Sequence, residues 1–263
     1  MKIININNQK GGVGKTTTVT AMANILSERG KRVLVVDCDG SSTTLTKLLL
    51  DELENAKTIK STLTDLLILQ TTGRDISKEL AKSVLVKCKH GYDLLPADNN
   101  LVGAVANLSM QNNLETRFKS MENILKLYKK DYDYMLLDAA PVLDIFSINE
   151  LIASDELLII SQCQEASKNA INELLQSVNS FVLPMKKIKI AGILLTMFDK
   201  RTKYGKEKIE EIGRVFDIPT FKAVIPRNIN AERYLGKDTS ILTDRRNKVG
   251  EAYIEFIDEY LKG

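Results

Sequence analysis

The sequence contains few of the residues on which disulfide or metal frameworks depend. Among its 263 residues are three cysteines, Cys38, Cys88 and Cys163, and a single histidine, His90. Because the cysteines are widely spaced, neither a disulfide framework nor a CxxC metal pair is indicated. A reducing cytoplasm is therefore the expected compartment. His90 follows Lys-Cys-Lys in a polar turn, which favours a surface position over a role as a ligand.

Long apolar runs are also missing. The stretch 151–160 is interrupted by Asp155 and Glu156, whereas a membrane span needs about 18–20 apolar residues. The N-terminal Met-Lys-Ile-Ile-Asn-Ile-Asn-Asn carries no apolar run with a small-residue cleavage site, so no export signal is expected. With 44% hydrophobic and 27% charged residues, the composition excludes disorder and collagen-like structure.

Basic residues are concentrated in the last third of the chain. Residues 182–248 hold 16 Lys and Arg against 8 Asp and Glu, whereas the rest of the chain holds 21 against 26. The overall net charge of +3 hides this asymmetry. A basic segment on a mildly acidic body points to a polyanion as partner, although solvated surface lysines give the same count.

Short β-branched runs alternate with longer helical patterns along the whole chain. Strands are predicted at 2–7, 32–37, 92–95, 134–138, 156–161, 188–196 and 220–225, and helices at 15–29, 101–110, 114–129, 167–181, 203–216 and 248–261. This alternation predicts an α/β fold with a doubly wound, mostly parallel sheet and helices on both faces. Without a Pro/Ser-rich linker or a repeat, a single domain over 1–263 is expected. Residues 50–89 show no clear period, and a helical segment with a mobile connection is one interpretation.

A glycine-rich segment follows the first predicted strand. It reads Asn8-Gln9-Lys10-Gly11-Gly12-Val13-Gly14-Lys15-Thr16-Thr17, and a helical pattern begins at once. Glycines bring backbone N–H groups close to phosphates, and the helix N-terminus adds partial positive charge. Lys15 is placed to reach the β- and γ-phosphates, and the Thr16 hydroxyl to hold Mg²⁺. Strand, loop and helix in this order predict a P-loop NTPase, although the general motif has glycine where Gln9 stands.

Two more predicted strands end in carboxylates. Asp37 and Asp39 follow one apolar strand, and Asp138 ends another. In a doubly wound sheet, ligands bind beyond the carboxyl ends of the strands, where the glycine-rich loop also lies. Three carboxylates at one place repel one another unless a cation is present, so Mg²⁺ is the predicted partner.

These motifs resemble those of the ParA family of partition ATPases, within the deviant Walker A class that also contains MinD-type proteins. The resemblance covers nearly the whole chain, through the P-loop 8–17, the acidic segment 36–39, the Walker B segment 133–141, and segments 192–199, 201–202 and 224–228. The P-loop defines the class, and the C-terminal segments point to ParA within it. The resemblance implies ATP and Mg²⁺ as cofactors and an ATPase that is weak alone.

The resemblance also implies roles for single residues. Lys10 is expected to reach across an ATP-bound sandwich homodimer to the partner subunit's phosphates, as an arginine finger does. Lys15 and Asp39 complete the catalytic set, with Asp39 orienting or activating the attacking water. The implied metal ligands are Thr16, Asp37 and Asp138. The implied nucleotide-binding residues are Lys10, Gly11, Gly12, Val13, Gly14, Lys15, Thr16, Thr17, Met197, Pro226, Arg227 and Asn228, of which Met197, Pro226 and Asn228 lie where relatives bracket adenine.

A partition ATPase holds duplex DNA in its ATP-bound dimer without sequence preference, through Lys and Arg contacts to phosphates. The DNA-binding residues expected in the basic segment are Lys200, Arg201, Lys203 and Arg233. A ParB-like centromere-binding adaptor is the implied stimulator, and a nucleoid-associated position in the cytoplasm the implied location. Only seven residues precede Asn8, so an N-terminal helix-turn-helix and operator binding are not expected.

Some segments depart from the family pattern. Gly40 and Ser41 stand where Pro-Gln is usual, and Ala139-Ala140-Pro141 where Cys-Pro-Pro is usual. Asn230 replaces an arginine that contributes to DNA binding in relatives, with Arg233 as a candidate substitute. These changes favour a plasmid or mobile-element member over a chromosomal one.

Two alternatives stay open. A MinD-like membrane-associated ATPase needs a terminal amphipathic helix with a basic polar face, but the tail 248–263 carries four acidic residues, which anionic lipids repel. We expect its Ile254, Ile257 and Leu261 to close the core instead, with no membrane contact. An iron–sulfur reductase needs two cysteines per subunit near the dimer axis, and the cysteine spacing does not resemble that arrangement.

Overall fold

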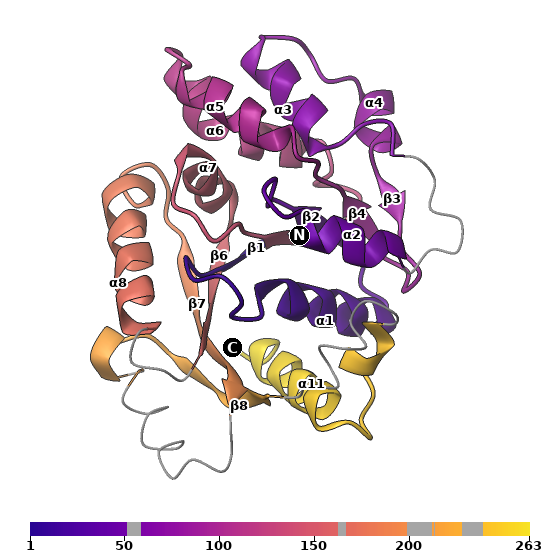
Figure 1. Ribbon diagram of the computed structural model, residues 1–263, viewed down its shortest axis with the longest axis vertical. Helices are drawn as coiled ribbons and strands as arrows, with labels where there is room; N and C mark the ends of the chain where they lie inside the picture. Colours follow the sequence, from indigo (N-terminus) through magenta and orange to yellow (C-terminus); the bar gives the residue numbers. More distant parts are fainter. Residues whose placement is uncertain (52–58, 163–166, 199–211, 213, 228–238) are drawn as a thin grey trace.

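The computed structural model describes residues 1–51, 59–162, 167–198, 212, 214–227 and 239–263. Within them, one eight-stranded sheet has the order β3-β4-β2-β5-β1-β6-β7-β8 (Figure 1). Its strands are β1 (Lys2–Asn7), β2 (Val33–Asp37), β3 (Val86–Lys87), β4 (Asp93–Leu95), β5 (Tyr134–Asp138), β6 (Glu156–Gln162), β7 (Lys189–Phe198) and β8 (Thr220–Pro226). Neighbouring strands are parallel except the antiparallel pair β3–β4. The predicted α/β fold with a mostly parallel sheet is confirmed.

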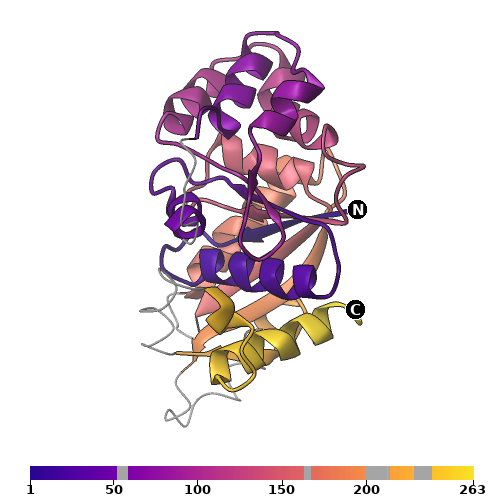
Figure 2. The same ribbon diagram turned by 90° about the vertical axis from the view of Figure 1, so that its right-hand side faces the viewer.

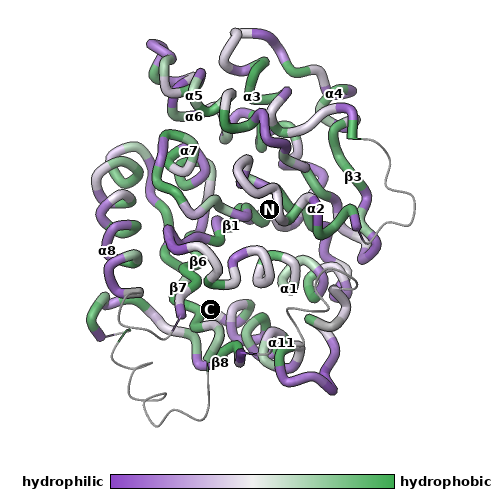
Figure 3. Tube along the Cα trace, in the orientation of Figure 1, coloured by the Kyte–Doolittle hydropathy of each residue, from purple (hydrophilic) through white to green (hydrophobic). Residues whose placement is uncertain are grey.

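Helices cover both faces of this sheet. One face packs against α1 (Lys15–Glu28), α2 (Thr44–Asp51) and α11 (Lys248–Tyr260). The other face packs against α3 (Leu63–Thr71), α4 (Lys78–Ser83), α5 (Leu101–Ser109), α6 (Leu114–Lys126), α7 (Ile145–Ala153) and α8 (Ser167–Ser177). Helices α1 and α11 lie side by side in both views (Figures 1 and 2). In Figure 3, β6 and β7 are largely green whereas α8 alternates green and purple, as befits a helix with one buried side.

The side chains of β1 point alternately to the two faces of the sheet. Ile4 and Ile6 belong to the core on the α1 side, and Ile3 to the core on the α7 side. Successive side chains of a strand point to opposite faces, so Asn5 and Asn7 share the face of Ile3. Both asparagines are buried. A polar column therefore runs along an otherwise apolar face.

The neighbouring strands β1 and β5 mark the point where the strand order of the sheet reverses. The chain passes from β1 toward one edge of the sheet and from β5 toward the other. From β1 it continues through α1 on one face to β2, whereas from β5 it continues through α7 on the other face to β6 (Figure 1). The loops after the two strands therefore diverge at their carboxyl ends. This is where ligands bind in open α/β sheets.

The sequence pattern does not predict every helix. Helix α7 is missing from the prediction, and its polar Ser147, Asn149 and Glu150 are buried together with its apolar residues, so polar positions in this segment do not mark an exposed helix face. Helix α2 is also missing from the prediction, and residues 50–89 contain α3, α4 and β3. The helix predicted at 167–181 is α8 followed by a π-turn, Val178–Val182. The helix predicted at 203–216 lies mostly outside the described residues, and the single domain over 1–263 stays a prediction.

The C-terminal helix α11 closes the sheet at β8. Ile257 is buried and Ile254 packs against the core, as predicted, but Leu261 is 41% exposed because the helix ends before it. The Glu259 carboxylate accepts hydrogen bonds from the backbone N–H groups of Lys222, at 3.0 and 2.9 Å, and Ala223, at 3.1 Å. It thereby occupies donors of the last strand. In the described part of the chain, no helix has the length and apolarity that a membrane crossing requires.

Candidate functional site

The glycine-rich loop between β1 and α1 has a backbone that only glycine adopts without strain at two positions. Gly12 and Gly14 have φ angles of 69° and 94°. Helix α1 begins directly after Gly14, which offers no side-chain cap, so the helix N-terminus is available to an anion. Gly11 is exposed, Val13 is buried and Thr17 is half-buried on the first turn of α1. This geometry suits a phosphate group.

The loop is tied to the neighbouring strands. The Asn8 side chain donates to the Ile160 carbonyl at 2.6 Å and accepts from the Lys10 N–H at 2.8 Å. The Thr196 hydroxyl donates to the Val13 carbonyl at 2.6 Å. These bonds fix the loop against the carboxyl ends of β6 and β7. A loop held in this way meets a ligand without further ordering, which lowers the entropic cost of binding.

Gln162, at the end of β6, also holds the loop and is not among the residues predicted from the sequence. Its amide nitrogen donates to the Gly12 carbonyl at 3.0 Å and lies 3.0 Å from the Met197 sulfur. Its amide oxygen accepts from the Lys10 ammonium at 3.5 Å. One side chain thus joins the loop, Lys10 and Met197. The signal that points to it is a polar residue directly after a buried strand that ends beside the loop.

Lys15 is buried inside the loop. It is 7% exposed, and its ammonium donates to the Lys10 carbonyl at 3.4 Å. Burial lowers the pKa of Lys15, whereas the carboxylates of Asp138, Asp39 and Glu150 raise it. A cation inside an N–H-rich loop and beside several acids is suited to neutralising the oxygens of a bound phosphate.

Thr16 and Asp138 come together as predicted for a magnesium site. The Thr16 hydroxyl donates to one oxygen of Asp138 at 2.8 Å, and the other oxygen is buried without a hydrogen-bond partner among the described residues. An unsatisfied buried polar group costs about 1–3 kcal/mol, and a cation or its bound water removes that cost. In the described part of the chain, no three His, Cys, Asp or Glu side chains form a metal site by themselves. The arrangement fits Mg²⁺, which uses one or two carboxylates and completes its shell with phosphates and water.

The buried Asp138 carboxyl predicts a pH-dependent stability. Burial first, and the nearby Asp37 second, raise the pKa of Asp138 from 3.8 to about 8. The folded protein therefore keeps a proton that the unfolded chain releases, and this stabilisation, complete below pH 3.8, is lost as the pH rises to about 8. Without nucleotide and Mg²⁺, the free energy of unfolding should fall over this range more steeply in the parent than in Asp138→Asn. Urea titrations at a series of pH values measure both slopes, and equal slopes would exclude a protonated Asp138.

The hydrogen bonds of Asp37 come from Thr46 and Asp39 rather than from Thr16. One oxygen accepts from the N–H and the hydroxyl of Thr46 at 2.9 and 2.7 Å, and the other from the Asp39 N–H at 3.0 Å. Burial raises the pKa of Asp37 more than these bonds lower it. Asp37 thus fixes the start of α2 and the path of the chain to Asp39, and its role as a direct metal ligand stays a prediction.

Asp39 is held by the serines that follow it. Ser41 donates its N–H at 3.0 Å and its hydroxyl at 2.6 Å, and Ser42 donates its hydroxyl at 2.7 Å. Partial burial raises the pKa of Asp39, but these hydrogen bonds outweigh it and leave the pKa below its ordinary value. A Cβ at Gly40 would lie 2.7 Å from the Leu101 Cβ. The Gly40-Ser41 departure therefore permits close packing on α5 and supplies donors to Asp39.

The residues predicted at adenine are partly described. Met197 lies near the end of β7, close to the P-loop, and has a φ of 52°. The next residue, Phe198, pairs with Pro226 on β8. The Arg227 N–H donates to the Phe198 carbonyl at 3.0 Å. Met197, Pro226 and Arg227 thus gather at the carboxyl ends of β7 and β8. The predicted residues that lie outside the described residues are Asn228, Lys200, Arg201, Lys203 and Arg233.

Glu150 is a further carboxyl beside the site that the sequence analysis does not single out. It lies on α7, is 1% exposed, and accepts from the Asn5 side chain at 3.2 Å. Asn5 in turn accepts from Asn7 at 2.9 Å. Burial raises the pKa of Glu150 well above its ordinary value, and the charges of Asp144 and Asp138 raise it further. The polar column on β1 therefore links α7 to the strand that leads into the P-loop.

Comparison with known proteins agrees with this geometry. Residues 1–190 match the AAA domain family. The chain is 34% identical over 260 residues to the sporulation initiation inhibitor protein Soj of Bacillus subtilis, covering 98% of this chain and 97% of that protein. It is 31% identical over 264 residues to the chromosome partitioning protein ParA of Myxococcus xanthus, covering 99% and 88%. A crystal structure of cobyrinic acid a,c-diamide synthase from Mycobacterium smegmatis with bound ADP and magnesium is similar with a TM-score of 0.79 and 27% identity, covering 100% and 94%.

Both partition proteins match this chain over almost its whole length. The similarity therefore includes the region beyond the P-loop, where the sequence motifs of segments 192–199 and 224–228 lie. The sheet order, the glycine-rich loop and these relatives lead to one assignment. The chain belongs to the ParA family of ATPases.

Proposed function

We propose that this protein is a DNA partition ATPase that binds and hydrolyses Mg·ATP at the P-loop. The observation that carries the proposal is the position of the buried Lys15 beside the Thr16–Asp138 contact, at the point where the chain reverses across the sheet. Lys15 neutralises the β- and γ-phosphates, and Thr16 and Asp138 hold Mg²⁺. When bound, the metal stabilises charge on the transferring phosphoryl group. The ADP and magnesium in the Mycobacterium smegmatis structure support both ligands.

Asp39 orients the attacking water in this proposal. Its oxygens accept from Ser41 and Ser42 at 2.6 to 3.2 Å, so the water must share or replace these donors. Hydrolysis is therefore slow in the isolated subunit. A conformational step that rearranges the segment after β2 sets the rate, as lid and loop movements do in many enzymes.

The ATP-bound form is a homodimer in which Lys10 acts across the subunit boundary. Lys10 lies at the start of the loop, and its ammonium is 3.5 Å from the Gln162 amide oxygen. That contact is a weak one by distance, so exchanging it for a contact with the partner subunit's phosphates costs little. A cation supplied in trans stabilises charge that lies between subunits.

Dimerisation aligns two basic segments, and the proposed output is DNA binding without sequence preference. The segment 182–248 holds 16 basic residues against 8 acidic ones, a surplus suited to phosphate contacts. The proposed contacts are Lys200, Arg201, Lys203 and Arg233. A ParB-like centromere-binding adaptor stimulates hydrolysis and releases the DNA, at the nucleoid in the cytoplasm. The partitioning function of the Myxococcus xanthus relative supports this output.

The packing of α11 favours DNA over a membrane surface as the partner. Its Tyr253, Phe256 and Ile257 are at most 1% exposed. A helix that inserts into a lipid interface needs an apolar face that is free to leave the protein. Removing α11 from the core exposes these side chains, and burying each contributes about 1.5–3 kcal/mol.

DNA binding measured with ATP, with ADP and without nucleotide tests the proposal. ATP alone should support binding to duplexes of arbitrary sequence, because phosphates are engaged in sufficient number only when two basic segments align. Each neutralised phosphate contributes about 0.9 to the salt exponent, so affinity should fall steeply between two salt concentrations. Arg201→Ala combined with Arg233→Ala should weaken binding and reduce the slope while ATP-dependent dimerisation survives.

Lys129→Ala with Lys130→Ala is the matched control, because both lysines are exposed and lie outside the basic segment. This control should bind DNA as the parent does. Equal DNA affinity in the arginine variant and the parent would exclude this surface. Binding of the parent to anionic vesicles, together with no response to DNA, would replace the partition function by a membrane-associated one.

A further inference from the structure

Two side chains at the ends of neighbouring strands hold successive carbonyl groups of the P-loop. Gln162, the last residue of β6, donates from its amide nitrogen to the Gly12 carbonyl at 3.0 Å. Thr196, near the end of β7, donates from its hydroxyl to the Val13 carbonyl at 2.6 Å. Because β6 and β7 lie next to each other in the sheet, both carbonyls turn toward the same side of the loop.

The direction of these carbonyls fixes the direction of two N–H groups. A trans peptide group is planar, and its C=O and N–H point in opposite directions; the described residues contain no cis peptide bond. The peptide of the Gly12 carbonyl carries the N–H of Val13, and the next peptide carries the N–H of Gly14. Both N–H groups therefore point away from the ends of β6 and β7. Successive N–H groups on one side of a chain form a concavity that binds anions.

These two N–H groups have no acceptor in the described part of the chain. Hydrogen bonds from the backbone nitrogens of Val13 and Gly14 are absent there. Val13 is 0% exposed, and a buried N–H without an acceptor is rare and unfavourable. An anion in front of the loop supplies the missing acceptor.

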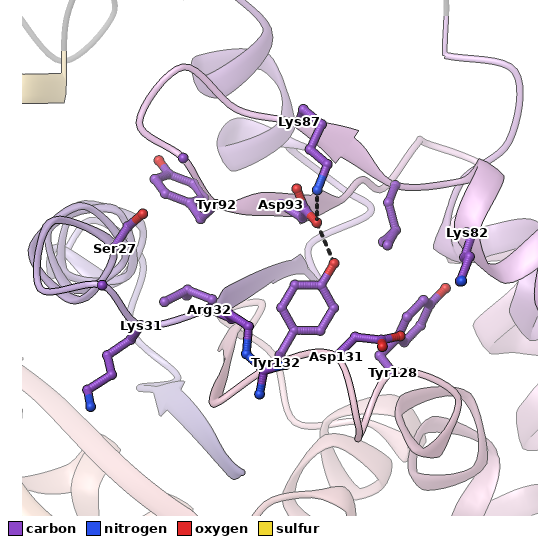
Figure 4. A pocket seen from close by; sticks show the side chains of 14 residues that line it. Ser27, Lys31, Arg32, Lys82, Lys87, Tyr92, Asp93, Tyr128, Asp131 and Tyr132 are labelled. Atoms are coloured by element: carbon purple, nitrogen blue, oxygen red, sulfur yellow. Dashed lines mark hydrogen bonds and ion pairs between the residues drawn. The ribbon is translucent and has the colours of Figure 1, made fainter.

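The polar groups at the other end of the strands do not share this property. A cavity of about 620 Å³ lies there, beside the end of α1 and the start of β2 (Figure 4). Its buried Asp93 accepts from the Tyr132 hydroxyl and pairs with the Lys87 ammonium at 2.7 Å, as the dashed lines in Figure 4 show. This buried carboxyl is thus satisfied within the protein, whereas the two N–H groups of the P-loop are not.

We propose that Gln162 and Thr196 are positioning residues, which turn two P-loop N–H groups toward the phosphates of the bound nucleotide. This inference rests on the ATPase function proposed above and assigns part of its phosphate affinity to the ends of β6 and β7. Thr196 is 2% exposed, so it acts through the peptide that it holds rather than by touching the nucleotide. Donors that are oriented before the ligand arrives need no reorganisation on binding, which increases affinity.

Thr196→Val tests the proposal, because valine keeps the size of the side chain and lacks the hydroxyl. Calorimetric titration of the full-length protein with Mg·ADP and with Mg·pyrophosphate measures the binding of the nucleotide and of phosphates alone. Both affinities should fall by roughly 10–100-fold, since hydrogen bonds to charged groups are lost when the peptide is free to turn. Thr196→Ser retains the hydroxyl and should restore most of both affinities. Gln162→Met should weaken both probes as well, and it tests the proposal independently if Thr196→Val does not fold.

Thr64→Val is the matched control. Thr64 lies on α3, is also 2% exposed, and its hydroxyl donates to Asp98 at 2.9 Å. Its replacement removes a buried hydroxyl of the same kind outside the P-loop, so this variant should bind both probes as the parent does. Thermal unfolding without ligand compares the stability of the two valine variants.

Equal probe affinities in the parent, Thr196→Val and Gln162→Met would overturn the proposal. So would a loss of affinity that Thr64→Val shares, because it would reflect general destabilisation. A variant that loses affinity for Mg·ADP but not for Mg·pyrophosphate would place the defect away from the phosphates, and a parent that binds Mg·ADP but not Mg·pyrophosphate would show that the loop is not oriented for phosphates; both results contradict the proposal. A parent that binds neither probe would overturn the ATPase function itself, and this inference with it.

Discussion

Replacing Lys15 with alanine is expected to abolish ATP hydrolysis and most of the affinity for ATP. Lys15 is the buried cation of the loop, and three carboxyls, Asp138, Asp39 and Glu150, act on its pKa. Without it, the phosphates of ATP enter a site whose nearest charges are acidic. Removing a single donor to a transition-state oxyanion lowers kcat by about 10²–10³-fold, and the loss here adds a direct charge repulsion.

Phosphate release at saturating Mg·ATP measures this effect, with nucleotide affinity measured separately. Lys31→Ala, which removes an exposed lysine just before β2, at the opposite end of the strands from the P-loop, should hydrolyse ATP at the parental rate. Thermal unfolding shows whether the Lys15 variant is folded. A folded Lys15→Ala protein with parental hydrolysis would mean that the P-loop is not the catalytic site.

Replacing Lys10 with alanine is expected to separate nucleotide binding from dimerisation. The Lys10 ammonium contacts the Gln162 amide oxygen, and the phosphates it is proposed to bind belong to the partner subunit, so its removal should leave the affinity of the subunit for ATP nearly unchanged. The ATP-bound dimer should not form, because the phosphates between the subunits lose a cation. Arginine fingers supplied in trans raise phosphoryl-transfer rates by about 10³–10⁵-fold, and stimulated hydrolysis should fall by a comparable factor.

Sedimentation velocity with and without ATP reports the dimer. Asp39→Ala is the informative counterpart, because it retains Lys10 but lacks the group that orients water, and it should accumulate an ATP-bound dimer. Lys10→Arg keeps the positive charge and should retain part of the dimer. If Lys10→Ala dimerised with ATP to the same extent as the parent, Lys10 would have no role across the subunits.

The sequence predicts the parts of the site that depend on neighbouring residues. Gly12, Gly14 and Lys15 follow one another in the loop, and their conformation is set by backbone sterics and by the helix that begins there. The strand ends that carry Asp37 and Asp138 follow from apolar runs. Their place beside the loop follows from the rule for doubly wound sheets.

The parts that the sequence does not predict depend on contacts between distant segments. Gln162 reaches Gly12 across 150 positions, and Glu150 reaches Asn5 across 145 positions. No local pattern encodes such a pairing. In helix α7 the polar Ser147, Asn149 and Glu150 are buried, and contacts with other elements rather than the local sequence determine that burial. The bond from Thr46 to Asp37 is local, but it requires α2 to be known first.

The contact between the Glu259 carboxylate of α11 and the edge strand β8 has a consequence for how copies of this chain meet. A sheet edge with open backbone amides is a template on which a strand from another molecule can add, which leads to fibres and precipitates. At β8 the amides of Lys222 and Ala223 already donate to Glu259, and the opposite edge is the short strand β3. The Glu259 carboxylate at the β8 edge and the short β3 strand at the other edge both disfavour the pairing of this sheet with a strand of another molecule. Loops and helices are therefore the surfaces left for the proposed association of subunits.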